Sequence, residues 1–377
     1  MFRFIHSTSN KKGSALLRWT FSTLLLMLCA CSGEDDVADV APPAALYSPT
    51  AQYPVEVTFK EGVKYNDILG AERSLNLAIY RPIDAPSPMP VVIFSHGGSN
   101  GKNNPQDVLA PWPETIASAG YLAIGIAHPA RKQASYDALC DHLGVSEDIT
   151  CALKINWDRP HDVTRVINWL EEQVDDTFDG VADLTKIAHF GHSAGAGCAM
   201  MLAGAPRNYL CSQPFGMNQG EVVSCDPDDL VSKVDTRVKA IIALSPQGPG
   251  ADGFMTESFA TVDIPVMIGT GANDGDAGEP LNRRDAFEQL DASPNGDERF
   301  MIYLDSEGAK HTLFQGNLDK CAEQVDMALC TQMREWLLSS TVAFLDHTFQ
   351  DRAKASTWLT TGGPSGVSAG TAEWSQK

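Results

Sequence analysis

The sequence has few basic side chains. Lysine and arginine together number 28 among 377 residues, against 48 aspartates and glutamates, so the formal net charge is −20 at pH 7. Residues 1–30 hold four of the basic residues and no acidic one, so the rest of the chain has 24 basic and 48 acidic residues and a charge near −24. Nucleic acids and anionic membrane surfaces attract basic proteins, so this balance argues against both as electrostatic partners.

Sequence patterns that bind zinc are also missing. Neither Cys-x-x-Cys nor His-Glu-x-x-His occurs at any position. Ligands at such spacings are typical of zinc sites. We therefore expect no metal and no cofactor.

The first thirty residues are typical of an export signal. No acidic residue precedes Glu34, and the apolar run at 21–30 is too short to span a membrane comfortably. The run ends in Leu28-Cys29-Ala30-Cys31, which resembles a bacterial lipobox. The resemblance implies cleavage before Cys31, acylation of that residue, and, with Ser32 next to it, anchorage in the outer membrane. The alternative is an ordinary signal peptide and a periplasmic or extracellular protein.

Composition divides the exported part of the chain into three segments. Residues 31–54 are rich in alanine and proline and are expected to form a flexible tether. Residues 351–377 are rich in glycine, serine and threonine and are expected to form a flexible tail. Residues 55–350, between them, are numerous enough for one large domain.

Strand-like and helix-like segments alternate within this domain. Buried strands are expected at 90–95, 121–127, 186–190, 238–244, 264–269 and 299–304, after an opening antiparallel pair at 55–60 and 75–82. Helices are expected at 112–119, 158–173, 196–203, 283–290 and 325–347. This alternation predicts an α/β fold with a mostly parallel central sheet and helices on both faces. The irregular stretches 129–157, 205–236 and 249–262 are expected to form the walls or lid of a cleft.

The segment Gly191-His192-Ser193-Ala194-Gly195 fits the G-x-S-x-G nucleophile elbow. In this motif the serine lies on a sharp strand-to-helix turn, and small residues on both sides let the strand and the helix approach. The N-terminus of the helix then stabilises negative charge at the reaction centre. Ser193 is the predicted nucleophile.

A nucleophilic serine needs a base, and the base needs an orienting acid. Only His311 and His347 follow Ser193 in the sequence. His311 lies in a loop after the last predicted strand, whereas His347 lies on the closing helix, so His311 is the predicted base. Asp274 directly follows a buried strand and is the predicted acid, with Asp276 as the alternative.

The oxyanion of a tetrahedral intermediate needs preorganised N–H donors. The backbone N–H groups of Ala194 and Gly98 are the predicted donors, because Ala194 follows the nucleophile and Gly98 lies in the loop after a buried strand. His96, in the same loop, is expected to form structural hydrogen bonds. His128, at the end of the next strand, is a candidate for lining the cleft.

The cysteines fit an oxidising compartment. Cys198 is expected to pack inside a helix, while six others form local pairs: Cys140 with Cys151, Cys211 with Cys225, and Cys321 with Cys330. Six cysteines allow fifteen pairings, so the connectivity stays open. On one helix the last pair would lie about 13 Å apart, so the closing helix must begin after Cys321.

The stretch from about residue 55 to 347 resembles the α/β-hydrolases related to dienelactone hydrolase, which include acetylhydrolase-like esterases and cutinase-like polyester hydrolases. The resemblance lies in Phe94-Ser95-His96-Gly97-Gly98, Arg159-Pro160-His161-Asp162, the elbow at 191–195, Leu244-Ser245-Pro246, Gly271-Ala272-Asn273-Asp274 and His311. It implies an α/β-hydrolase fold and hydrolysis of carboxylic esters through an acyl-enzyme. Two features differ: dienelactone hydrolases use cysteine where this chain has Ser193, and the animal acetylhydrolases take their acid at the position of Ser245-Pro246.

Two other functions remain open at this point. A serine peptidase or amidase would use the same residues, and a non-catalytic lipoprotein would only bind its ligand. The sequence does not indicate the acyl chain length, the alcohol, or the oligomeric state.

Overall fold

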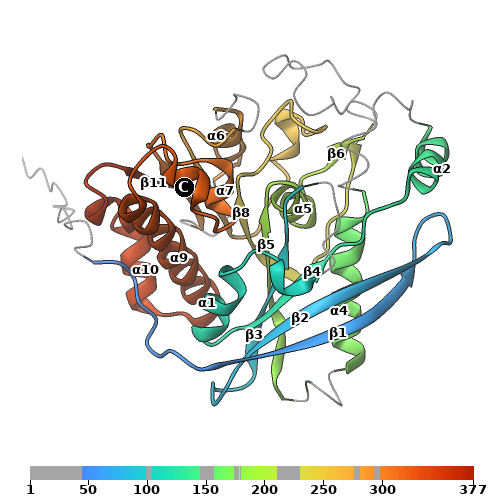
Figure 1. Cartoon of the computed structure of the whole chain (residues 1–377), viewed down its shortest axis with the longest axis horizontal. Coiled ribbons are helices and arrows are strands. Elements are labelled where there is room, and N and C mark those ends of the chain that lie inside the picture. The colour runs from blue at the N-terminus through green and yellow to red at the C-terminus, as the bar shows by residue number, and fades with distance from the viewer. Residues whose placement is uncertain are drawn as a thin grey trace, which may run out of the picture. The chain divides into compact units, whose positions relative to one another are not determined.

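The described residues form a mixed α/β structure around a mostly parallel sheet, which confirms the predicted class. The computed structural model describes residues 45–98, 104–144, 157–173, 178, 180–209, 230–275, 281–292 and 298–377. Within these residues nine strands pair in the order β1-β2-β4-β3-β5-β8-β9-β10-β11 (Figure 1). Neighbours from β4 to β10 are parallel, while β1 with β2, β2 with β4, and β10 with β11 are antiparallel.

The strands lie close to the apolar runs in the sequence. Their bounds are β1 Val55–Asn66, β2 Glu72–Pro82, β3 Met89–Ser95, β4 Leu122–Ala127, β5 Ala182–His192, β8 Val238–Leu244, β9 Val266–Gly271, β10 Arg299–Leu304 and β11 Ala372–Gln376. A separate two-stranded sheet joins β6 Arg207–Asn208 to β7 Leu230–Val231. All residues of β3, β4 and β9 are buried, as expected for strands covered on both faces.

Helices cover both faces of the sheet. Their bounds are α1 Trp112–Ser118, α2 Gln133–Leu143, α4 Arg159–Gln173, α5 Ala194–Leu202, α6 Leu281–Glu288, α7 His311–Phe314, α8 Asp319–Ala322, α9 Met327–Gln350 and α10 Ala353–Thr360, with 3₁₀ turns η1 Pro105–Asp107, η4 Thr256–Ser258 and η5 Gly363–Val367. Side chains of α4 and α5 pack in one apolar cluster with Val91 and Ile93. Those of α1, α9 and α10 pack in a second cluster with Val92 and Phe94. Alternate residues of one strand therefore face opposite layers.

The prediction of a flexible tail at 351–377 was wrong. Residues 353–360 form α10, and β11 pairs with β10 at the edge of the sheet. The Trp374 ring stacks on Phe300 at 5.6 Å, and Trp358 is buried. Composition indicated disorder because glycine, serine and threonine dominate, but two tryptophans bury enough apolar area to order the segment.

The prediction of a flexible tether also fails for its described part, residues 45–54. Tyr47 is buried, and its hydroxyl donates to Asp346 Oδ2 at 2.6 Å. The Tyr53 N–H donates to the Ser118 carbonyl at 2.8 Å. One buried tyrosine and these hydrogen bonds tie the segment to α9 and α1. Residues 31–44, the export signal and Cys31 lie outside the described residues.

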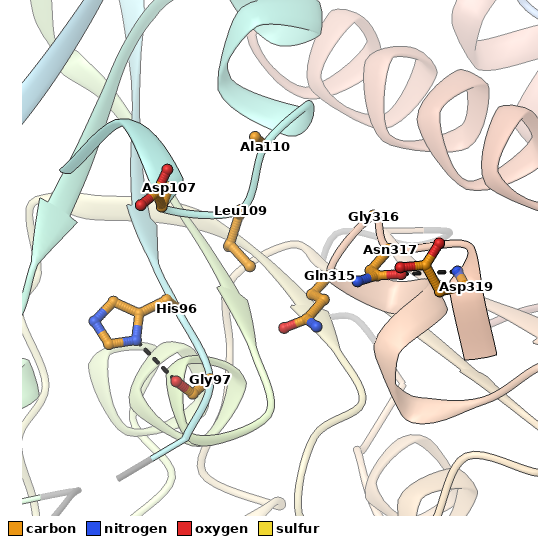
Figure 2. A pocket seen from close by; sticks show the side chains of 9 residues that line it. All are labelled: His96, Gly97, Asp107, Leu109, Ala110, Gln315, Gly316, Asn317 and Asp319. Atoms are coloured by element: carbon orange, nitrogen blue, oxygen red, sulfur yellow. Dashed lines mark hydrogen bonds between the residues drawn. The ribbon is translucent and has the colours of Figure 1, made fainter. Parts of the chain in front are cut away.

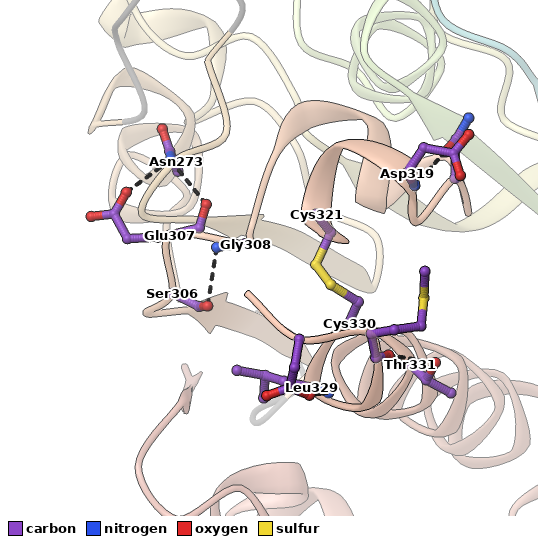
Figure 3. Close-up of a disulfide and its surroundings, with 12 residues drawn as sticks. Asn273, Ser306, Glu307, Gly308, Asp319, Cys321, Leu329, Cys330 and Thr331 are labelled. Atoms are coloured by element: carbon purple, nitrogen blue, oxygen red, sulfur yellow. Dashed lines mark hydrogen bonds between the residues drawn. A yellow bond between two sulfur atoms is a disulfide. The ribbon is translucent and has the colours of Figure 1, made fainter. Parts of the chain in front are cut away.

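The structure joins Cys321 and Cys330 in a disulfide (Figure 3). Cys321 is in α8 and Cys330 is in α9, and the chain turns between Ala322 and Met327. The long helix thus begins after Cys321, as the pairing requires, and the Cα atoms lie 5.9 Å apart. Of the other predicted pairs, Cys151, Cys211 and Cys225 lie outside the described residues.

No helix in the described part of the chain is long and apolar enough to cross a membrane.

Candidate active site

Ser193 lies in the turn between β5 and α5. Its backbone has φ 53° and ψ −118°, a conformation that costs free energy for any residue except glycine. The turn is held by a hydrogen bond from the Ser193 N–H to the Leu244 carbonyl at 2.9 Å. A Cβ atom at Gly191 would collide with the Gly195 carbonyl, and one at Gly195 would collide with the Ser95 carbonyl. Both glycines are therefore required for the strand and helix to approach.

His311 and Asp274 meet beyond the carboxyl ends of β9 and β10. Nδ1 of His311 lies 2.8 Å from Oδ1 of Asp274. Asp274 is fully buried and His311 is 8% exposed. An isolated bridge between Asn273 and Lys310 brings the two loops together. Because Nδ1 donates to the carboxylate, the neutral ring carries its lone pair on Nε2, where a base needs it. The alternative acid, Asp276, lies outside the described residues.

Asp274 is kept ionised by its surroundings. Burial alone would raise the pKa of this carboxyl, but the Arg283 guanidinium and the His311 hydrogen bond together lower it. Thr270 Oγ1 donates to Asp274 Oδ2 at 2.8 Å, and Nε of Arg283 lies 3.5 Å from Oδ1. An ionised, fully bonded carboxylate can hold the imidazole in one tautomer and orientation.

Arg283 is a site residue that sequence reasoning missed. Arg283 is buried in α6. Its Nε donates to the Asp274 carbonyl at 2.8 Å, and its Nη1 donates to the Ser245 carbonyl at 2.6 Å. It thereby ties the loop that carries the acid to the loop after β8. The sequence offered no signal beyond an arginine in an expected helix.

His192 links the nucleophile turn to the base. Its ring centroid lies 4.6 Å from that of His311, and its Nε2 donates to the His311 carbonyl at 3.0 Å. Burial lowers the pKa of His192 well below its ordinary value, so the ring is neutral. Because His192 directly precedes Ser193, these contacts place the serine, the base and the acid in one region.

The loop 96–98 lies against the nucleophile. A Cβ atom at Gly97 would lie 2.7 Å from Nδ1 of His192 and 3.0 Å from Cβ of Ser193. Gly98 has φ +76°, which favours glycine. Ala194 is the first residue of α5, and N–H groups in a first turn have no partner within the helix. The two predicted oxyanion donors thus belong to segments that flank Ser193.

A cavity of about 460 Å³ adjoins this loop (Figure 2). It is lined by three segments: the loop 96–98, the stretch around η1, and the turn after α7. Among the described residues, polar side chains dominate the lining and His96 is its only basic member; these residues are His96, Gly97, Asp107, Leu109, Ala110, Gln315, Gly316, Asn317 and Asp319. The cavity is therefore a small polar space next to the nucleophile turn.

The other candidate histidines form packing contacts and hydrogen bonds away from the nucleophile. His347 packs its ring on Phe300 at 6.0 Å and hydrogen-bonds Ser356 through Nδ1, in keeping with a position on the closing helix. His128 is buried in a hydrogen-bond network behind the loop 96–98 rather than lining the cavity. Among the described residues, no group of three or more histidine, cysteine, aspartate or glutamate side chains could hold a metal ion.

No protein-family model matches the chain, and no curated protein matches it at a significant level. The function is therefore inferred from the geometry of the site.

Proposed function

We propose that the protein is a serine hydrolase of the α/β-hydrolase fold that cleaves carboxylic esters. One observation carries the proposal: the His311–Asp274 pair at 2.8 Å adjoins a serine on a strained strand-to-helix turn. The chain order serine, aspartate, histidine is that of the α/β-hydrolases. The resemblance in sequence to dienelactone-hydrolase-related esterases supports the same assignment.

Each residue has a defined task in the proposed reaction. Ser193 Oγ attacks the ester carbonyl while His311 Nε2 takes its proton, and Asp274 stabilises the imidazolium that forms. The N–H groups of Ala194 and Gly98 bind the oxyanion, aided by the N-terminus of α5. The protonated His311 then donates to the leaving alcohol. Water, activated by the same histidine, releases the acid and restores Ser193.

The cavity supports a compact, polar substrate. Its volume of about 460 Å³ holds a small acyl or alcohol group, and its lining offers carboxylates and amides rather than an apolar tunnel. We therefore propose short-chain esters as substrates, with long fatty acyl esters and polyesters as the alternatives that a chain-length profile distinguishes.

We also propose that the protein is exported and attached to the bacterial outer membrane through Cys31. The proposal rests on the basic and apolar segments of residues 1–30 and the following Leu28-Cys29-Ala30-Cys31. Labelling of expressing cells with a palmitate analogue tests it. A Cys31→Ser variant should lose the label and the membrane association.

The test of function is hydrolysis of p-nitrophenyl esters from acetate to palmitate by the wild type and by Ser193→Ala. We expect activity on the shortest esters and a loss of at least about 10³-fold in the variant. Ser339→Ala is the matched control, since Ser339 is 7% exposed against 8% for Ser193 but lies in α9. Full activity of Ser193→Ala would refute the proposal. Turnover of p-nitroanilides alone would indicate an amidase, and a lack of turnover and of fluorophosphonate labelling would indicate a binding protein.

A further inference from the structure

We propose that Arg159 and His96 are positioning residues that orient the peptide groups of the loop 96–98, so that the Gly98 N–H faces the oxyanion. The inference rests on the proposed function, because an oxyanion forms only if Ser193 attacks a carbonyl. It assigns a role to Arg159, which the proposed reaction does not use.

Each carbonyl of the loop has its own donor. Nη1 of Arg159 donates to the His96 carbonyl, and Nη2 donates to the Gly98 carbonyl at 2.7 Å. The Gly97 carbonyl between them accepts from His96 Nδ1 at 2.8 Å (Figure 2). In a trans peptide the N–H points opposite to the carbonyl that precedes it. Holding the carbonyls of His96 and Gly97 therefore sets the directions of the Gly97 and Gly98 N–H groups.

Glycine makes this anchoring necessary. Two consecutive glycines have no Cβ to restrict their backbone, so an unanchored loop would sample many peptide orientations. A donor contributes to catalysis only when it is already aimed at the oxyanion. The Arg159 and His96 hydrogen bonds supply that preorganisation.

Burying the charged Arg159 side chain at this position costs free energy. Its side chain is 3% exposed, and among the described residues no carboxylate forms an ion pair with it within 4 Å. Burial lowers the pKa of Arg159 to about 10. Burying a guanidinium is unfavourable unless hydrogen bonds compensate. Here the carbonyls of the loop 96–98 accept the hydrogen bonds, so the compensation of the buried guanidinium also holds the loop in place.

A buried relay keeps the His96 ring in place. The His128 ring contacts His96 edge-on, with centroids 5.4 Å apart. His128 is held at both nitrogens: Nδ1 lies 2.9 Å from Asp162 Oδ2, and Nε2 lies 2.8 Å from Ser95 Oγ. His189 Nε2 lies 2.9 Å from the same Ser95 oxygen. Because Nδ1 of His128 donates to the Asp162 carboxylate, Nε2 of the neutral ring accepts from the Ser95 hydroxyl. The Ser95 oxygen in turn accepts from Nε2 of His189.

This relay repeats the arrangement of a catalytic triad, but it has a different use. Ser95 and Asp162 are fully buried and His128 is 3% exposed, so no substrate reaches them. Asp162 is on the first turn of α4, as is Arg159. One helical turn therefore holds both the loop carbonyls, through Arg159, and the histidine behind the loop, through Asp162.

The test compares Arg159→Met with Arg299→Met. Arg299 is a matched control, because it is equally buried and donates to backbone carbonyls, those of Val262, Ile264 and Asp291, at the opposite end of the strands. We expect Arg159→Met to lower kcat about 10- to 100-fold with little change in KM, and to weaken an alkylboronate inhibitor by a similar factor. Arg299→Met should keep kcat while losing stability. Equal kcat losses in both variants would overturn the proposal.

His96 is tested by rescue. His96→Ala should lose activity as Arg159→Met does, whereas His96→Asn, which places an amide N–H near the position of Nδ1, should stay within about threefold of the wild type. Equal loss in both His96 variants would show that the ring packs without orienting the loop.

A readout without substrate separates this inference from the proposed function. Amide hydrogen exchange in the peptide that covers 96–98 should be faster in Arg159→Met than in the wild type, and unchanged in Arg299→Met. If the wild type hydrolyses no ester, the proposed function fails and the exchange rates still report whether Arg159 holds the loop. Unchanged exchange in Arg159→Met would overturn the inference even in an active esterase.

Discussion

Lowering the pH from 7 to 5 is expected to destabilise the folded protein through its buried histidines. Burial lowers the pKa of His128 from 6.5 to about 4, so this ring stays neutral in the folded state at pH 5. In the unfolded chain it takes up a proton once the pH falls below about 6.5. The unfolded state then binds more protons, and stability is lost as the pH falls from about 6.5 towards 4.

The magnitude follows from the pKa difference. Each pH unit in this window corresponds to about 1.4 kcal/mol, so at pH 5 His128 alone lowers the free energy of unfolding by about 2 kcal/mol. Burial lowers the pKa of His189 to about 3, which adds a comparable amount. Urea unfolding followed by the fluorescence of the six tryptophans after Cys31 should show a midpoint about 1 M lower at pH 5 than at pH 7.

The control is a variant without the titrating ring. His128→Asn keeps a polar group beside Asp162 but cannot take up a proton between pH 7 and 5. Its loss of stability over this interval should be smaller than that of the wild type by about 2 kcal/mol. If wild type and variant lose the same amount, His128 is not the neutral buried ring described here and the reasoning is refuted.

Three further predictions concern the acid, the disulfide and the C-terminal segment. Asp274→Asn should lower kcat about 10⁴-fold without unfolding the protein, because the amide favours the wrong His311 tautomer; activity within tenfold of the wild type would exclude Asp274 as the acid. Replacing Cys321 and Cys330 by serine should lower the free energy of unfolding in urea by about 3 kcal/mol, and no change would show that the pair is not bonded in the native protein. Trp358→Ala should cost about 3–5 kcal/mol in the same assay, whereas a loose tail would tolerate it without loss.

The local features of the fold could be predicted from the sequence. The apolar run at 90–95 corresponds to β3 Met89–Ser95, and that at 299–304 to β10 with the same bounds. A strand buried on both faces needs an unbroken apolar stretch, so its position is visible in one segment. Gly191 is equally local, because a Cβ atom there would collide with the Gly195 carbonyl within the same turn.

Only the tertiary structure decided which distant residues meet. Arg283 reaches Ser245, 38 positions earlier, and Arg159 reaches the loop 96–98 more than 60 positions earlier. Such contacts depend on how helices pack across the sheet, and no local periodicity encodes them. The segment 351–377 is the clearest case, since its composition indicates a loose tail. It is ordered because Trp374 stacks on Phe300 and β11 completes the edge beside β10, a surface that exists only in the folded domain.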